Sequence, residues 1–137
     1  MMKLDIKIHK GIGDIYFDAP VEEVVTILGQ PDEVENIDNA ADESTTVLRY
    51  EEGLTLFFEG ENPRLSCIDI SCEETTLFGK KLFDMNEKDI VKLMVDNGMF
   101  EQDVDNEDWG ERRVTFNEGN IDFYFDADEL LSVIIGK

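Results

Sequence analysis

The sequence predicts an α+β fold made of two tandem units, each an amphipathic helix followed by an antiparallel β-meander. Three observations predict it: the chain of 137 residues resembles itself after a shift, each half holds one stretch with helical spacing of apolar residues, and the segments that follow alternate apolar and polar residues. We expect the helices to pack on one face of the sheet. Residues 1–71 should form an N-terminal strand and the first unit and residues 72–137 the second, within one compact domain.

The internal similarity is found at a shift of 66 positions. Four residues of the first half then coincide with identical residues of the second: Gly13, Phe17, Asp18 and Val25 with Gly79, Phe83, Asp84 and Val91. Further along, Leu65-Ser66-Cys67-Ile68 meets Leu131-Ser132-Val133-Ile134, and with one residue of slip Leu54, Leu56 and Phe58 meet Ile121, Phe123 and Phe125. Because the matches keep their order across a whole half, they indicate a duplication.

Each half contains one predicted helix. Val21, Val24, Val25 and Leu28 follow the spacing i, i+3, i+4, i+7, with Pro20 at the entry and Gly29-Gln30-Pro31 at the end. In the second half Asn86 is the expected N-cap, with Asp89 three residues on. Ile90, Leu93 and Met94 form the apolar stripe and Gly98 ends the helix.

Acidic segments without apolar periodicity follow the two helices, at residues 32–44 and 101–111, and we expect both to be loops. Strands are predicted at residues 4–8, 46–50, 54–59, 65–71, 113–116, 121–126 and 131–135. Single strands do not alternate with helices, so the pattern argues against a parallel nucleotide-binding sheet.

Alternation also assigns the strand residues to two faces. Leu54, Leu56 and Phe58, with their counterparts in the second half, should form the core beneath the helices. The opposite, outer face should carry Thr55, Phe57, Cys67, Asp69, Asp122, Tyr124, Val133 and Ile135. This set is less polar than a solvated face normally is.

The stretch Ile15-Tyr16-Phe17-Asp18-Ala19-Pro20-Val21-Glu22-Glu23-Val24, followed by Leu28-Gly29-Gln30-Pro31-Asp32, resembles the opening of the repeat in the beta-lactamase inhibitor protein superfamily. It is similar also to the small lipoprotein of the outer-membrane barrel-assembly machinery. The resemblance implies a helix leading into an antiparallel sheet, present twice as in the tandem inhibitors. The second copy has Met94 to Gly98 in place of the Leu-Gly-x-Pro ending, and the resemblance does not transfer the beta-lactamase target.

Composition restricts the partners. The chain has 33 Asp and Glu against 12 Lys and Arg, a net charge of −21, with acid in both halves. Such a field repels nucleic acid and anionic membranes, so we expect a basic or neutral protein partner. No apolar run approaches the roughly 20 residues of a membrane span, and we expect a cytoplasmic protein with Cys67 and Cys72 as free thiols.

The sequence offers no catalytic constellation. His9 is the single histidine, so the cysteines lack an evident base, and histidine-rich metal sites are excluded. Asp103, Asp105 and Glu107 have the spacing of a calcium loop, but Asp108 replaces its glycine and Val114 its last ligand. We therefore expect a protein that is not an enzyme and that holds neither metal nor cofactor.

The leading interpretation is a non-enzymatic, protein-binding inhibitor, of the immunity type, that masks a basic partner through its outer sheet face. Its expected partner-binding residues are Phe57, Tyr124, Trp109, Asp69 and Asp122. For Trp109 the alternative is a cover over one end of the core. The second hypothesis is a structural or scaffold module that forms homo-oligomers through the same face.

Overall fold

The computed structural model describes residues 3–38, 44–107 and 110–137. The elements are β1 (Ile6–Lys7), β2 (Gly11–Ile12), β3 (Ile15–Tyr16), α1 (Val21–Leu28), β4 (Glu33–Asp38), β5 (Ser44–Tyr50), β6 (Leu54–Glu59), β7 (Arg64–Ile70), β8 (Thr76–Leu77), β9 (Lys80–Lys81), α2 (Glu87–Asp96), β10 (Gln102–Asn106), β11 (Arg112–Phe116), β12 (Ile121–Asp126) and β13 (Glu129–Gly136). Short 3-10 turns lie at Leu82–Asp84 and Asn117–Gly119. The fold is mostly antiparallel sheet with two α-helices, which fits the α+β class.

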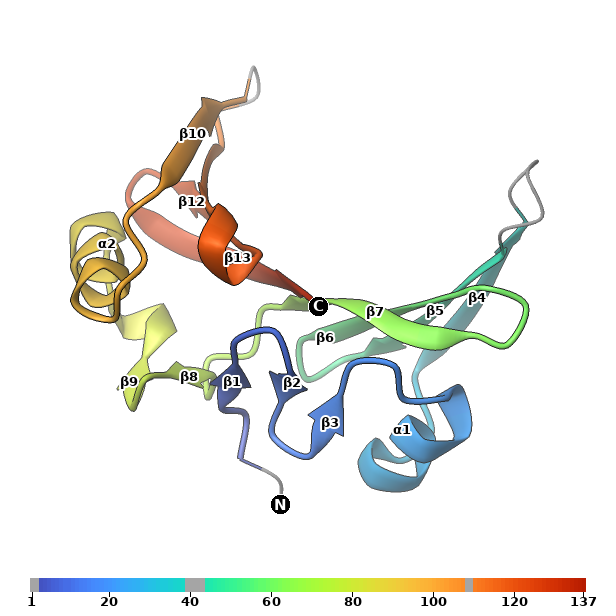
Figure 1. The fold of residues 1–137 in the computed structure, drawn as a ribbon. Helices are drawn as coiled ribbons and strands as arrows, with labels where there is room; N and C mark the ends of the chain where they lie inside the picture. The colour runs from blue at the N-terminus through green and yellow to red at the C-terminus, as the bar shows by residue number, and fades with distance from the viewer. Residues whose placement is uncertain (1–2, 39–43, 108–109) are drawn as a thin grey trace.

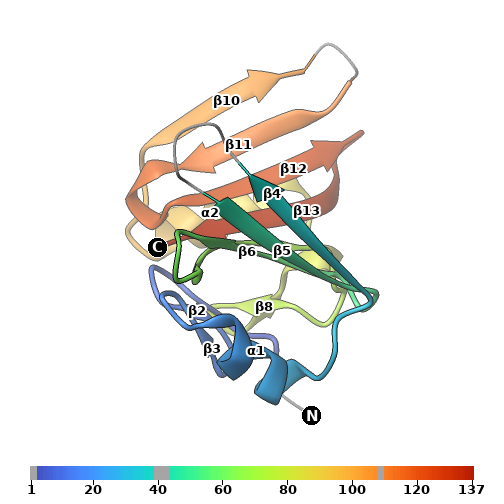
Figure 2. The same cartoon turned by 90° about the vertical axis from the view of Figure 1, so that its right-hand side faces the viewer.

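One eight-stranded antiparallel sheet dominates the structure, in the order β10-β11-β12-β13-β7-β6-β5-β4. Strands β7 and β13 pair at its centre, so residues from both halves of the chain share one sheet. The sheet is strongly curved, and both helices and the two small sheets lie on its convex side (Figures 1 and 2). The opposite side, which we call the concave face, carries no covering element among the described residues.

The core lies between the sheet and the elements on its convex side. Phe58 and Phe125 are fully buried, as predicted, and Val24 of α1 and Ile90 and Met94 of α2 belong to the same buried cluster. Val25 and Val91, the expected counterparts, lie in the helices but are only partly buried. In both helices the residue before the expected one, Val24 or Ile90, is the buried residue of that pair. Neither helix of the described chain is long and apolar enough to cross a membrane.

The two expected loops are wrong in part, because each contains an edge strand. β4 pairs with β5 and β10 pairs with β11, so each half contributes four strands to the sheet instead of three. Residues 33–37 of β4 and all of β10 are exposed. Strands exposed on both faces need no apolar alternation, which removes the signal on which the sequence prediction depended.

The register also corrects the strand after each hairpin. A β-bulge follows Phe57 in the β6–β7 pair and Tyr124 in the β12–β13 pair. Leu56 pairs with Ile68, and its counterpart Phe123 pairs with Val133. Val133 therefore takes the place of Ile68, whereas the sequence match at a shift of 66 gave that place to Ile134. Ile134 is therefore not the buried counterpart of Ile68, and Leu130, not Leu131, is the buried leucine of β13.

The N-terminal region forms shorter strands than expected. The predicted strand at residues 4–8 is reduced to β1, which pairs with β2 in a three-stranded sheet closed by β3. Position 11 of β2 requires glycine, because a Cβ added there would lie 2.0 Å from the Ile15 carbonyl oxygen. β8 and β9 form a similar small hairpin in the second half. Two-residue strands carry too little pattern to be predicted.

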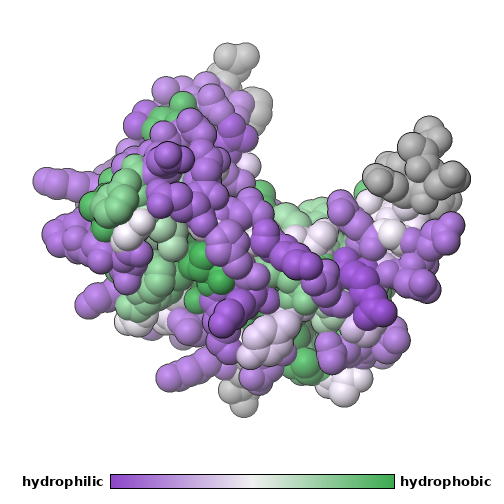
Figure 3. All heavy atoms as spheres, in the orientation of Figure 1, coloured by the Kyte–Doolittle hydropathy of each residue, from purple (hydrophilic) through white to green (hydrophobic). Residues whose placement is uncertain are grey.

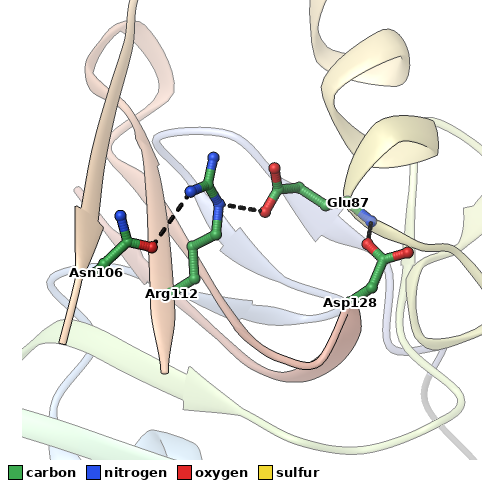
Figure 4. Close-up of polar contacts among 4 residues, drawn as sticks. All are labelled: Glu87, Asn106, Arg112 and Asp128. Atoms are coloured by element: carbon green, nitrogen blue, oxygen red, sulfur yellow. Dashed lines mark hydrogen bonds and ion pairs between the residues drawn. The ribbon is translucent and has the colours of Figure 1, made fainter. Parts of the chain in front are cut away.

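Helix α2 begins as predicted, with Asn86 accepting a hydrogen bond of 2.9 Å from the Asp89 backbone N–H. Its first turn is also fixed to the sheet (Figure 4). Arg112 donates from Nε to Glu87 at 2.7 Å and from Nη1 to Asn106 at 3.2 Å, and the Glu87 N–H donates to Asp128 at 3.1 Å. These contacts hold the start of α2 against β10, β11 and the β12–β13 turn.

Candidate functional site

The concave face is the surface that the fold leaves open. Figure 3 shows the molecule hollowed between the two arms of the sheet, with green and pale atoms among the purple ones. One row of register partners crosses all eight strands on this face: Glu33, Arg49, Thr55, Asp69, Ile134, Asp122, Thr115 and Asp103. The six members on β5, β6, β7, β13, β12 and β11 alternate with buried core residues along their strands, and Glu33 and Asp103 end the row on the exposed edge strands.

Apolar side chains lie beside this row. Val47, Phe57 and Cys67 are register partners on β5, β6 and β7, and Val47 is only 1% exposed although it points away from the helices. Phe57 and Cys67 are half-buried, as are Ile134 and Tyr124. The curvature of the sheet thus brings neighbouring side chains into contact and provides an apolar floor.

Charges on the concave face are arranged unevenly. Both arginines are engaged toward the edge strands, Arg49 with Glu35 at 2.9 Å and Arg113 with Asp105. The central aspartates lie on either side of Ile134 and have no cationic partner within the described chain. Asp122 accepts a hydrogen bond from the Thr115 hydroxyl, whereas Asp69 has no hydrogen bond from a described residue. The centre of the face therefore carries uncompensated negative charge.

Burial shifts three of the central groups. It raises the pKa of Asp69, and it raises the pKa of the Cys67 thiol to about 11, with further contributions from the Asp69 and Asp122 carboxylates. The pKa of Tyr124 is raised too, first by burial and then by Asp122. Cys67 is accordingly a neutral thiol at physiological pH and a poor nucleophile.

The structure brings together four of the five predicted partner-binding residues: Phe57, Tyr124, Asp69 and Asp122 all lie on the concave face. Trp109 lies outside the described residues. Val133 and Ile135 were assigned to this face wrongly, because they pair with Phe123 and Ile121 and are buried in the core. The turn between β12 and β13 has two residues, against four between β6 and β7, so residues of β13 correspond to those of β7 at a shift of 65 and not 66, which exchanges the two faces.

Sequence reasoning missed Ile134, Val47 and Arg113 on this face. Ile134 and Val47 are apolar residues next to apolar residues, Ile135 and Leu48, so two-fold alternation does not say which of each pair faces the helices. The signal that assigns them is the cross-strand register with Asp69 and Phe57, which needs the sheet order.

The single histidine of the chain lies away from the row that crosses the concave face. His9 is exposed and contacts the Glu118 carbonyl oxygen through Nε2 at 2.7 Å, in the 3-10 turn before β12. Among the described residues no group of three or more His, Cys, Asp or Glu side chains is arranged to hold a metal ion. Both cysteines are free thiols, as expected. What the face offers chemically is apolar contact and negative charge.

Comparisons of the chain with protein-family models, with curated proteins and with solved structures give no match.

Proposed function

We propose that this protein is a non-enzymatic binding protein that masks a basic protein partner on its concave face, in the manner of an immunity-type inhibitor. The observation that carries the proposal is the centre of that face. Asp69 and Asp122, without cationic partners, flank Ile134 beside the half-buried rings of Phe57 and Tyr124. Aromatic anchors next to charge that lacks a counterpart are what a basic protein surface complements.

The unpaired acids of the concave face reduce the stability of the fold, and this supports a functional origin for them. A net charge of −21 opposes folding through self-repulsion, and a half-buried carboxylate without a partner adds to that cost. A purely structural sheet face would place such a carboxylate beside one of the arginines. Here Arg49 and Arg113 are held by Glu35 and Asp105 instead.

Homo-oligomers formed through the same face are the second candidate, supported by the apolar floor of Val47 and Phe57. The charge argues against them. Two copies joined face to face would bring Asp69 and Asp122 of one protomer against the same acids of the other, and like charges removed from water together are costly. A heterologous basic partner avoids this repulsion.

We also propose that the chain is a tandem repeat of the beta-lactamase inhibitor protein-like type. Three observations support it: both halves run hairpin, helix, four antiparallel strands; β7 and β13 meet at the centre; and the bulges follow Phe57 and Tyr124, which occupy corresponding places in the two halves. If the second half had arisen independently of the first, nothing would require the same bulge at the corresponding place.

The test is capture of partners from the native host, followed by titration of variants against the captured protein at two salt concentrations. Phe57→Ala and Tyr124→Ala should each weaken binding by about 1–3 kcal/mol, because aromatic anchors contribute more to a complex than to the free protein. Neutralising Asp69 and Asp122 should slow association and flatten its salt dependence.

Phe100→Ala is the matched control, since Phe100 is 65% exposed and precedes β10 outside the concave face. It should leave the affinity unchanged. Unchanged affinity of both Phe57→Ala and Tyr124→Ala, in variants that remain folded, would rule out the concave face as the binding surface. A dimer mass for the free protein at neutral pH, abolished by the same substitutions, would favour the homo-oligomer.

A further inference from the structure

One end of the concave face holds a hollow of about 440 Å³, on the first half of the sheet. Its lining includes Glu33 of β4, Arg49 of β5, Glu51 of the following turn, Thr55 of β6, and Asp69 and Ser71 at the end of β7. The hollow therefore continues the row of register partners that crosses the sheet, and Asp69 is the lining residue nearest the sheet's centre.

The hollow is acidic, and its one cation is already engaged. Arg49 is held by Glu35 at 2.9 Å. The carboxylates of Glu33, Glu51 and Asp69 have neither an ion pair nor a hydrogen bond with a described residue. Of these three, Asp69 is half-buried and the other two are exposed. A fourth lining acid, Asp32, accepts a hydrogen bond of 2.7 Å from the Glu51 backbone N–H and has no ion pair with a described residue. A cation in the hollow would thus meet four carboxylates without counter-charge, of which Asp69 is partly withdrawn from water.

An apolar row lies directly beside the hollow. Val47, Phe57 and Cys67 precede or follow Arg49, Thr55 and Asp69 by two residues on the same three strands. Two residues along a strand correspond to about 7 Å. The apolar row and the acidic hollow are therefore about as far apart as residues i and i+2 of an extended chain.

The second half does not repeat this pairing. Asp69 pairs with Thr55 in the first half, and the corresponding pair in the second half is Ile134 with Asp122. Arg113 stands in the second half where Val47 stands in the first. The hollow and its apolar neighbour distinguish one arm of the concave face from the other. A partner docked on the face is therefore oriented by this arm.

We propose that the basic partner presents an extended segment with an apolar residue and, two positions on, a lysine or arginine. The apolar side chain packs on Val47, Phe57 and Cys67, and the cation enters the hollow against Asp69. The aliphatic stem of the Lys or Arg crosses the Thr55 position between the two contacts. This inference rests on the proposed function, and it adds to it the chemistry and the spacing of the partner's contact residues.

The experiment is a titration followed by ¹H–¹⁵N NMR with a synthetic five-residue peptide, acetylated and amidated, that has leucine at its second and arginine at its fourth position. The same peptide with glutamine in place of arginine is the ligand control. Saturable shifts should be confined to amides of β5, β6 and β7 around the hollow. The glutamine peptide should bind at least about fivefold more weakly, as should the arginine peptide to Asp69→Asn.

Asp103→Asn is the matched protein control, because Asp103 ends the same row on the opposite edge and the substitution removes the same charge. It should change the affinity less than about twofold. Equal losses in Asp69→Asn and Asp103→Asn, shifts spread over the whole acidic surface, or the absence of a saturable shift at millimolar peptide would overturn the inference. If a captured partner loses affinity for Phe57→Ala but not for Asp69→Asn, the inference fails while the proposed function stands.

Discussion

At the scale of single residues, Asp69 is the side chain that the fold explains least and the proposed function explains best. It lies half-buried between Thr55 and Ile134, without a hydrogen bond or ion pair from the described chain, and burial raises its pKa. An acidic group whose pKa is raised on folding destabilises the protein in its charged form. Residues that reduce the stability of the free protein are common at binding and catalytic sites.

Replacing this residue tests that view. Because the carboxyl pKa is raised on folding, stability falls as the pH rises from the unfolded-state value near 3.9 through the folded-state value, and the deficit is complete at neutral pH. Asp69→Asn removes the titrating group, so it should be more stable than the wild type at neutral pH, with a smaller advantage in acid. Urea denaturation at pH 7 and near pH 3 measures both differences. A variant less stable than the wild type at pH 7 would show that the carboxylate stabilises the fold.

At the scale of elements, the sequence predicted the helices and strands that have a buried face and missed the strands that have none. β6 and β12 begin and end where their alternation predicted, and α1 and α2 begin at the expected residues after Pro20 and Asn86. The edge strands β4 and β10 were taken for loops because exposure on both faces leaves no pattern. The concave face was predicted correctly on β6, β7 and β12 but not on β13. The turn before β13 is two residues shorter than the turn before β7, so an alignment at one fixed shift assigns the residues of β13 to the wrong faces.

Neighbouring residues of β12 provide the matching experiment. Phe125 is 2% exposed and packs in the core, whereas Tyr124, next to it, lies on the concave face. Phe125→Ala should lower the free energy of unfolding by about 3–5 kcal/mol, and Tyr124→Ala by about 1 kcal/mol or less. Chemical denaturation of the two variants compares the faces directly. Losses of similar size would contradict the division of β12 into a core face and a binding face.

At the scale of the whole molecule, charge and shape lead to the same kind of partner. The net charge of −21 was evident from composition and predicts a partner other than nucleic acid or an anionic membrane. Curvature was not evident, because it depends on the order of eight strands and on all the covering elements lying on one side (Figure 1). Once that order is known, the half-buried residues Phe57, Tyr124 and Ile134 fall together on one open surface whose centre has no counter-charge.

Whether the concave face contacts the partner can be measured by oxidative footprinting of the complex. Hydroxyl radicals label accessible aromatic rings, and mass spectrometry reports the rate at each one with and without the captured partner. We predict that labelling of Phe57 and Tyr124 slows in the complex while labelling of Phe100, outside the face, keeps its rate. Protection of Phe100 with unchanged rates at Phe57 and Tyr124 would show that the partner binds elsewhere than on the concave face.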